Sequence, residues 1–138
     1  MKKLLLIVLS IVGFVNFTKA DTIDFWSIYL NETKLQNCNG FAIGKVVLKI
    51  NDIKRTDSLT VNYFTCAACF DCETRVSVEN SQGKVIASGK GLGTYNPIKI
   101  SLFDMVQNSG KMIYIAYFYR GLDKDSANKQ ELFTLQFE

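Results

Sequence analysis

Four cysteines carry most of the chemistry that this 138-residue sequence could perform. Three of them form a C-x2-C-x2-C cluster at Cys66, Cys69 and Cys72, and the fourth is Cys38. An even number of cysteines in an exported chain indicates disulfides. We therefore expect Cys38 to bridge to one member of the cluster while the other two pair locally. The spacing does not choose among the connectivities that four cysteines allow.

The same cluster has two alternative interpretations, a thiolate metal site and a redox centre. Structural zinc usually takes two separated C-x2-C pairs, and here the second partner would be the single Cys38. A redox C-x2-C needs to open a helix that lowers the thiol pKa, and no such helix is indicated here. The prediction is therefore structural disulfides with no cofactor and no metal. The alternative is a thiolate metal-binding or redox protein.

Catalytic side chains are scarce. The sequence contains no histidine, which removes the commonest general base and the histidine-dependent catalytic triads. Hydrolysis by carboxylates needs two of them at a definite separation in a cleft, and the spacing shows no such pair. We expect no catalytic residue and no enzymatic activity, and we assign the available carboxylates to turns and to the cysteine loop: Asp52, Asp57, Asp71 and Glu73.

Three further motifs have ordinary structural interpretations. Ser88–Thr94 is rich in glycine but does not match the phosphate-binding loop, so it predicts a corner of a β-sandwich. Asp123–Glu131 has oxygen-bearing side chains at partly calcium-like spacing but lacks the loop glycine, so it predicts a solvated loop. Asn31-Glu32-Thr33 is a glycosylation sequon, which matters only in a eukaryotic secretory pathway.

The first residues are typical of a secretory signal. Lys2 and Lys3 precede a mostly apolar stretch at residues 4–17, and Thr18-Lys19-Ala20 matches a cleavage site. The apolar stretch is shorter than the ~20 residues needed to span a bilayer. We expect residues 1–20 to be a cleaved signal peptide and residues 21–138 to be one domain. The protein would then be secreted or periplasmic, with no membrane span after cleavage.

Charge and composition narrow the classes of partner. The chain is 48% hydrophobic and 21% charged, which is typical of a globular domain. Signal cleavage would remove three of its 16 basic residues and none of its 13 acidic residues, leaving a formal net charge of zero. Nucleic-acid binding requires a basic surface to neutralise phosphates. We therefore expect no nucleic-acid partner.

Short β-rich segments must position these residues. Asn80–Gly83 has the composition of a hairpin turn, and Asp104–Asn108 could form one helical turn. The alternation after Cys72 places Val76 and Val78 inward, with Arg75, Ser77 and Glu79 outward. Eight segments are predicted as strands: Thr22–Leu30, Phe41–Ile50, Leu59–Thr65, Glu73–Glu79, Lys84–Gly89, Pro97–Phe103, Lys111–Arg120 and Glu131–Glu138.

Strands at this spacing, without helices between them, predict an all-β fold. The specific prediction is an antiparallel two-sheet Greek-key sandwich with an immunoglobulin-like architecture and about seven or eight strands. The segment Ile98–Ala116 is similar to the entry to strand F of an immunoglobulin-like domain. The paired cysteines and core tryptophan of that family are absent, so the similarity is one of architecture.

The segment Lys111–Arg120 gives the best indication of a binding surface, because it is apolar or aromatic on both faces. We predict that it is the central strand of its sheet and that compact Ile113, Ile115 and Tyr117 enter the core. Tyr114 and Phe118 would then form a partly covered partner-binding face.

A binding role follows from these observations together. The sequence predicts a small exported, non-catalytic binding or envelope-assembly module, with an inhibitor of a hydrolase as a special case. Its partner would be a protein or another macromolecule in the envelope or the extracellular space.

Overall fold

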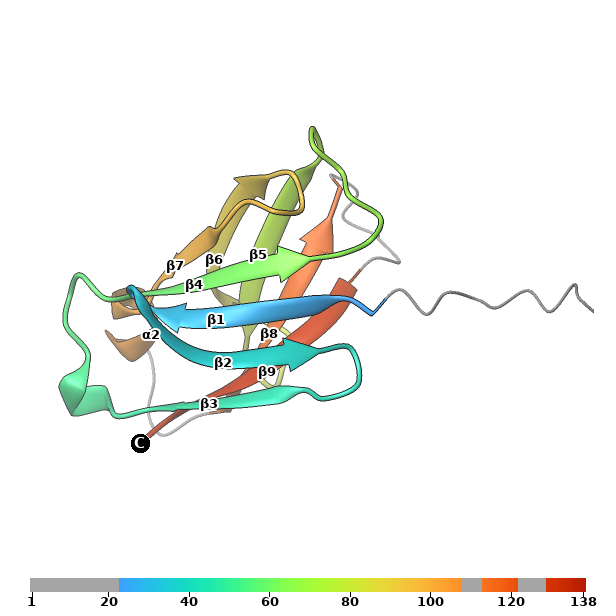
Figure 1. Cartoon of the computed structure of the whole chain (residues 1–138). Helices are drawn as coiled ribbons and strands as arrows, with labels where there is room; N and C mark the ends of the chain where they lie inside the picture. Colours follow the sequence, from blue (N-terminus) through green and yellow to red (C-terminus); the bar gives the residue numbers. More distant parts are fainter. Residues whose placement is uncertain (1–22, 108–112, 122–128) are drawn as a thin grey trace, which may run out of the picture.

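The computed structural model describes residues 23–107, 113–121 and 129–138, which fold into two β-sheets packed face to face (Figure 1). The predicted signal peptide and the turn predicted at residues 108–110 lie outside these ranges. No helix within them is long and apolar enough to cross a bilayer.

The two sheets contain four and five strands. The first has the order β2-β1-β4-β7 and comprises β1 (Phe25–Leu30), β2 (Thr33–Asn39), β4 (Ser58–Phe64) and β7 (Ile98–Ser101). The second has the order β3-β9-β8-β5-β6 and comprises β3 (Gly44–Leu48), β5 (Glu73–Glu79), β6 (Val85–Leu92), β8 (Ile113–Arg120) and β9 (Lys129–Phe137). Every pairing is antiparallel except that of β3 with β9. The all-β prediction is confirmed.

Two short helices interrupt the strands, η1 (Ile50–Asp52) and α2 (Phe103–Gln107). The second corresponds to the helical turn expected near Asp104–Asn108. Each of the eight predicted strands has a counterpart, and β5 matches its predicted bounds. The sequence pattern missed β2, because five of its seven residues are polar, its one leucine, Leu35, is exposed, and only Cys38 is buried. An edge strand with one inward side chain has no strong alternation to detect.

The core lies between the two sheets and is built from the inward-facing residues of both. Trp26 of β1 is fully buried, and its indole Nε1–H donates to the carbonyl of Leu132 on β9 at 3.0 Å. A register shift in the β8–β9 pairing leaves Leu132 without a partner on β8. Because a bulge of this kind frees a backbone group from the ladder, the indole can tie one sheet to the other.

Glycines close one edge of the sandwich, where β6 and β7 approach each other from different sheets. A Cβ atom at Gly89 would overlap the carbonyl oxygen of Lys99 on β7. At Gly91 a Cβ would lie 3.0 Å from the Ile98 side chain. The glycines of Ser88–Thr94 therefore serve close packing at a corner, as their pattern predicts.

Candidate functional site

The cysteine cluster contains one disulfide, between Cys69 and Cys72, whose Cα atoms are 5.8 Å apart. This bridge is one of the local pairings that the cluster allowed. Cys66 is a free, exposed cysteine at the start of the same loop, and Cys38 is free and buried.

The predicted bridge from Cys38 to the cluster is wrong. Cys38 on β2 lies opposite Trp26 on β1, which lies opposite Tyr63 on β4. Two strand spacings of ~4.8 Å therefore separate Cys38 from β4, beyond the ~7 Å that a disulfide can join. Burial raises the pKa of the Cys38 thiol more than its hydrogen bonds lower it, so Cys38 is an unreactive core residue.

The disulfide loop between β4 and β5 is held against the loop between β6 and β7. The backbone N–H of Thr94 donates to the Cys69 carbonyl at 2.9 Å, and the Cys69 N–H donates to the Thr94 hydroxyl at 3.2 Å. The N–H of Gly93 donates to the Cys72 carbonyl at 2.8 Å. Gly93 has a φ of 77°, and a Cβ there would lie 2.9 Å from the Phe70 carbonyl oxygen. Together with the disulfide, these contacts brace both loops.

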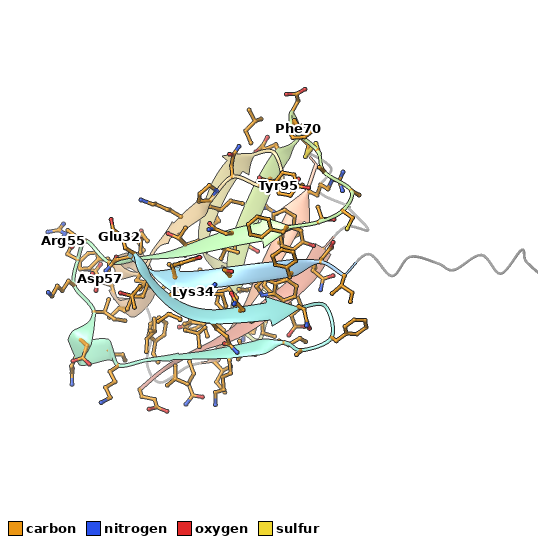
Figure 2. The ribbon with its side chains drawn as sticks, in the orientation of Figure 1. Glu32, Lys34, Arg55, Asp57, Phe70 and Tyr95 are labelled. Atoms are coloured by element: carbon orange, nitrogen blue, oxygen red, sulfur yellow. A yellow bond between two sulfur atoms is a disulfide. The ribbon has the colours of Figure 1, made fainter. Side chains whose placement is uncertain are left out.

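Four aromatic side chains form an exposed cluster beside these loops, which we call the aromatic patch: Phe25, Phe64, Phe70 and Tyr95. Phe25 and Phe64 are directly opposite on β1 and β4, and their rings stack at 4.8 Å. The Tyr95 ring lies 5.9 Å from Phe64 and 6.4 Å from Phe70. Figure 2 shows Phe70 at the tip of its loop with Tyr95 beneath it. The Tyr95 hydroxyl donates to the Thr65 carbonyl at 2.8 Å, which fixes its ring.

The aromatic patch is open to solvent and carries no charge. Phe70 is 74% exposed, Phe25 50% and Tyr95 41%. A pocket of about 280 Å³ beside the rings is lined by six uncharged residues: Ile23, Phe25, Phe64, Thr65, Cys66 and Tyr95. Contiguous exposed apolar surfaces of this kind are typical of interaction sites. No sequence pattern reveals this surface, because its residues come from two strands and two loops that are distant in sequence.

The predicted partner-binding face of β8 is reversed. The strand is central in its sheet, as predicted. Tyr114 and Phe118, however, are buried at 1% and 3% exposure, whereas Ile113 is 57% exposed. The inner face is aromatic because rings from other strands meet it, with Phe118 stacked on Tyr63 at 4.0 Å. Buried as they are, Tyr114 and Phe118 are not accessible to a partner in this fold.

The outer face of β8 carries a charged cluster around Glu79 of β5. The Glu79 carboxylate is 5% exposed and accepts hydrogen bonds from Ser77 at 2.9 Å, Tyr119 at 2.5 Å and Lys129 at 2.8 Å. Lys129 lies over the Tyr117 ring at 3.7 Å, and Arg75 lies over the Tyr119 ring at 4.4 Å. The prediction that Arg75, Ser77 and Glu79 point away from the core is correct, but Ser77 and Glu79 are covered by their neighbours.

This cluster shifts the pKa values of its charged groups. Burial alone would raise the pKa of Glu79, but the hydrogen bonds from Lys129, Tyr119 and Ser77 outweigh it and lower that pKa. Burial would lower the pKa of Lys129, and its contacts with Glu79 and Tyr119 outweigh that effect and raise it. Both groups are therefore held in their charged forms, as a structural ion pair requires.

Two of the carboxylates considered from the sequence, Asp57 and Glu73, lie just before β4 and at the start of β5. Asp57 accepts from the Lys54 backbone N–H at 2.8 Å and from the Asn31 side chain at 3.0 Å, and these bonds lower its pKa. In Figure 2, Asp57 and Arg55 lie at the end of the molecule opposite Phe70. Glu73 forms an ion pair with Lys90 at 3.2 Å.

The metal interpretation has no geometric counterpart in the described ranges. They contain no group of three or more His, Cys, Asp or Glu side chains arranged to hold an ion. Most of the partly calcium-like motif, residues 123–128, lies outside the part of the chain that the structure describes.

The fold and the aromatic patch together define the class, a two-sheet β-sandwich with an uncharged, partly exposed aromatic surface at one end. No protein-family model matches the chain, and no curated protein matches its sequence. The geometry of the patch and its braced loops is therefore the basis for a functional assignment.

Proposed function

We propose that this chain is a small exported, non-catalytic protein that binds another protein in the envelope or extracellular space through the aromatic patch. The observation that carries the proposal is the stacked Phe25–Phe64 pair, in which Phe25 is half exposed and Phe64 partly buried, continued by the exposed Tyr95 and Phe70. Aromatic residues dominate protein interfaces because they offer large apolar area with few rotatable bonds. The braced loops add to this by holding the rings in place before a partner arrives.

An inhibitor of a hydrolase would be a special case of this function. Phe70 is 74% exposed at the tip of a loop that the Cys69–Cys72 disulfide and the contacts with Thr94 restrain. A restrained loop with an apolar tip suits insertion into an enzyme's cleft, since little conformational entropy is lost on binding.

The proposed architecture is an immunoglobulin-like Greek-key sandwich. Three features support it. The neighbouring strands β5, β8 and β9 have the order expected of the three-stranded immunoglobulin sheet, and β4 pairs with β7 in the opposite sheet. The short helix α2 precedes β8, at the corner that leads into the central strand.

The alternative proposal is a thiolate redox or metal-binding protein, which one observation favours. Cys66 is exposed and free, three residues before the Cys69–Cys72 disulfide in the same loop. Thiol titration combined with metal analysis of protein purified from its native compartment separates the two proposals. One disulfide, a titratable Cys66 thiol that does not exchange with it and no bound metal favour binding, whereas a Cys66 thiol that exchanges with the disulfide, or bound zinc or copper, favours the alternative.

Site-specific photocrosslinking tests the binding function directly. A benzophenone amino acid placed at Phe70 is expected to capture a partner in the organism that makes the protein. The matched control carries the same group at Val85, which is 46% exposed at the start of β6, the end of that strand remote from the disulfide loop. The Phe70 adduct should disappear when Phe64→Ser is added. Equal capture from both positions, or none from Phe70, would refute the proposal.

A further inference from the structure

A second pocket lies at the end of the sandwich between the two sheets and is separate in chemistry from the aromatic patch. Its volume is about 280 Å³, and its walls come from the residue before β1, from β4, and from β8 and β9. Its lining includes three charged residues, Asp24, Arg120 and Lys129, together with Tyr63. Unlike the neutral pocket beside the patch, this one presents charges of both signs.

The negative group is the Asp24 carboxylate, which accepts a hydrogen bond from the Tyr63 hydroxyl. Tyr63 is held by stacking, 6.1 Å from the Trp26 ring and 4.0 Å from the Phe118 ring. Burial and the neighbouring Asp24 carboxylate raise the pKa of Tyr63, so the phenol keeps its proton. A neutral donor orients the carboxylate but does not neutralise its charge.

The positive group is the Arg120 guanidinium. Lys129 also lines the pocket, but its ammonium is paired with Glu79 at 2.8 Å. Among the residues that the structure describes, Arg120 forms no ion pair with Asp24 or with any other carboxylate. One cation and one anion therefore face the same small cavity without neutralising each other.

We propose that this pocket binds a small zwitterion, a free α-amino acid, with its carboxylate on Arg120 and its ammonium group on Asp24. A guanidinium recognises a carboxylate through two parallel hydrogen bonds, and an aspartate accepts from an ammonium. A ligand with only one charge would leave the opposite wall charge desolvated and unpaired, which is costly. An α-amino acid has an ammonium group and a carboxylate attached to the same carbon, and it is small enough for the cavity.

The test uses backbone amide NMR of the protein titrated with glycine, L-alanine and L-glutamine at millimolar concentrations. We expect saturable shifts in the residues around Tyr63 and Arg120 from at least one of these probes. N-acetyl-L-alanine and L-alaninamide are blocked forms of L-alanine, and each lacks one of its two charges. For a probe that binds, the blocked forms should bind at least about tenfold more weakly, which corresponds to ~1.4 kcal/mol.

Two variants assign the contacts. Arg120→Gln and Asp24→Asn should each weaken amino-acid binding about tenfold or more, whereas Arg55→Gln, at the opposite end of the molecule, should leave it unchanged. The spectrum of each variant shows whether its fold is retained, and Arg120→Gln alone is decisive if Asp24→Asn disturbs Tyr63. No response to any of the three amino acids, or equal binding of the blocked forms, would overturn the proposal. Neither result would bear on the aromatic patch.

Discussion

The two outer faces of the sandwich both present aromatic rings, but their surroundings differ. On the four-stranded sheet, Phe25 stacks on the partly buried Phe64 and stays half exposed beside uncharged neighbours. On the five-stranded sheet, Tyr117 and Tyr119 lie under Lys129 and Arg75, and Glu79 links the hydroxyl of Tyr119 to Lys129.

This difference shows that aromatic content alone does not identify a binding surface. Rings covered by cations are satisfied within the chain through cation–π contacts and hydrogen bonds, so they add stability and leave little for a partner. Rings without such cover keep their apolar area available. Removing residues from the covered face should therefore lower stability, and removing them from the open face should lower binding.

The largest expected effect comes from the inner side of β8, beneath the covered face. Phe118→Ala should lower the free energy of unfolding by ~3–5 kcal/mol, because it leaves a cavity against Tyr63. Ile113→Ala, on the same strand but 57% exposed, should change it by about 0.5 kcal/mol or less. Chemical denaturation of both variants measures this contrast, and a reversed order would show that the faces of β8 have been assigned the wrong way round.

The next effect concerns the anion that organises the covered face. Glu79→Ala removes the acceptor for Ser77, Tyr119 and Lys129, and should cost about 2 kcal/mol, the range for hydrogen bonds to charged groups. The control is Glu73→Ala, which breaks the exposed pair with Lys90 and should cost less than ~1 kcal/mol. Equal losses in thermal or urea unfolding would mean that burial of Glu79 contributes nothing.

The ion pair of Glu79 and Lys129 predicts a specific pH dependence of the free energy of unfolding. The folded pKa of Glu79 is lowered, so its contribution is present above the unfolded value near ~4.3 and is lost as pH falls through the folded pKa. The folded pKa of Lys129 is raised, so its contribution holds below ~10.4 and is lost as pH rises through the folded pKa. Urea unfolding across this range should show both losses, and Glu79→Gln should reduce the acid one. An unchanged acid profile in that variant would contradict the assignment.

The smallest effect on stability is expected at the aromatic patch, where substitutions should instead reduce the exposed apolar surface. The double variant Phe25→Ser and Phe70→Ser should change the free energy of unfolding by about 1 kcal/mol or less, because both rings are at least half exposed. It should also reduce binding of a fluorescent hydrophobic dye. Phe41→Ser removes a ring that is 75% exposed outside the patch and is the control. Equal dye loss in the control would mean that the patch is not a distinct apolar surface.

Several elements could be predicted from the sequence because their alternation has one apolar side. Leu59, Val61 and Tyr63 face the core as their pattern indicates, and so do Val76 and Val78. The hairpin at Asn80–Gly83 was equally predictable, since Gly83 adopts a φ of 74° and Asn80 closes the turn by accepting from Lys84. In each case the physical determinant is local.

Other features depended on which strands become neighbours. The strand Ile113–Arg120 is apolar on both sides, so alternation cannot choose its inner face, and a shift of one residue exchanges the two. The opposing rings of Tyr63 and Phe137 make that choice. Strand neighbours also explain why Cys38 is free. It lies on β2, and β1 separates β2 from β4, the strand that leads to the cysteine cluster.

The sequence by itself determined every described strand except β2, the all-β class and the central place of β8, because period-2 alternation and turn residues act over a few positions. Only the tertiary structure decided the functional surfaces. Phe25 meets Phe64 because β1 pairs with β4, Glu79 meets Lys129 because β8 joins their strands into one sheet, and Asp24 faces the cavity of Arg120 because two sheets end together. Such contacts join residues that are distant in the chain, and local patterns carry no record of them.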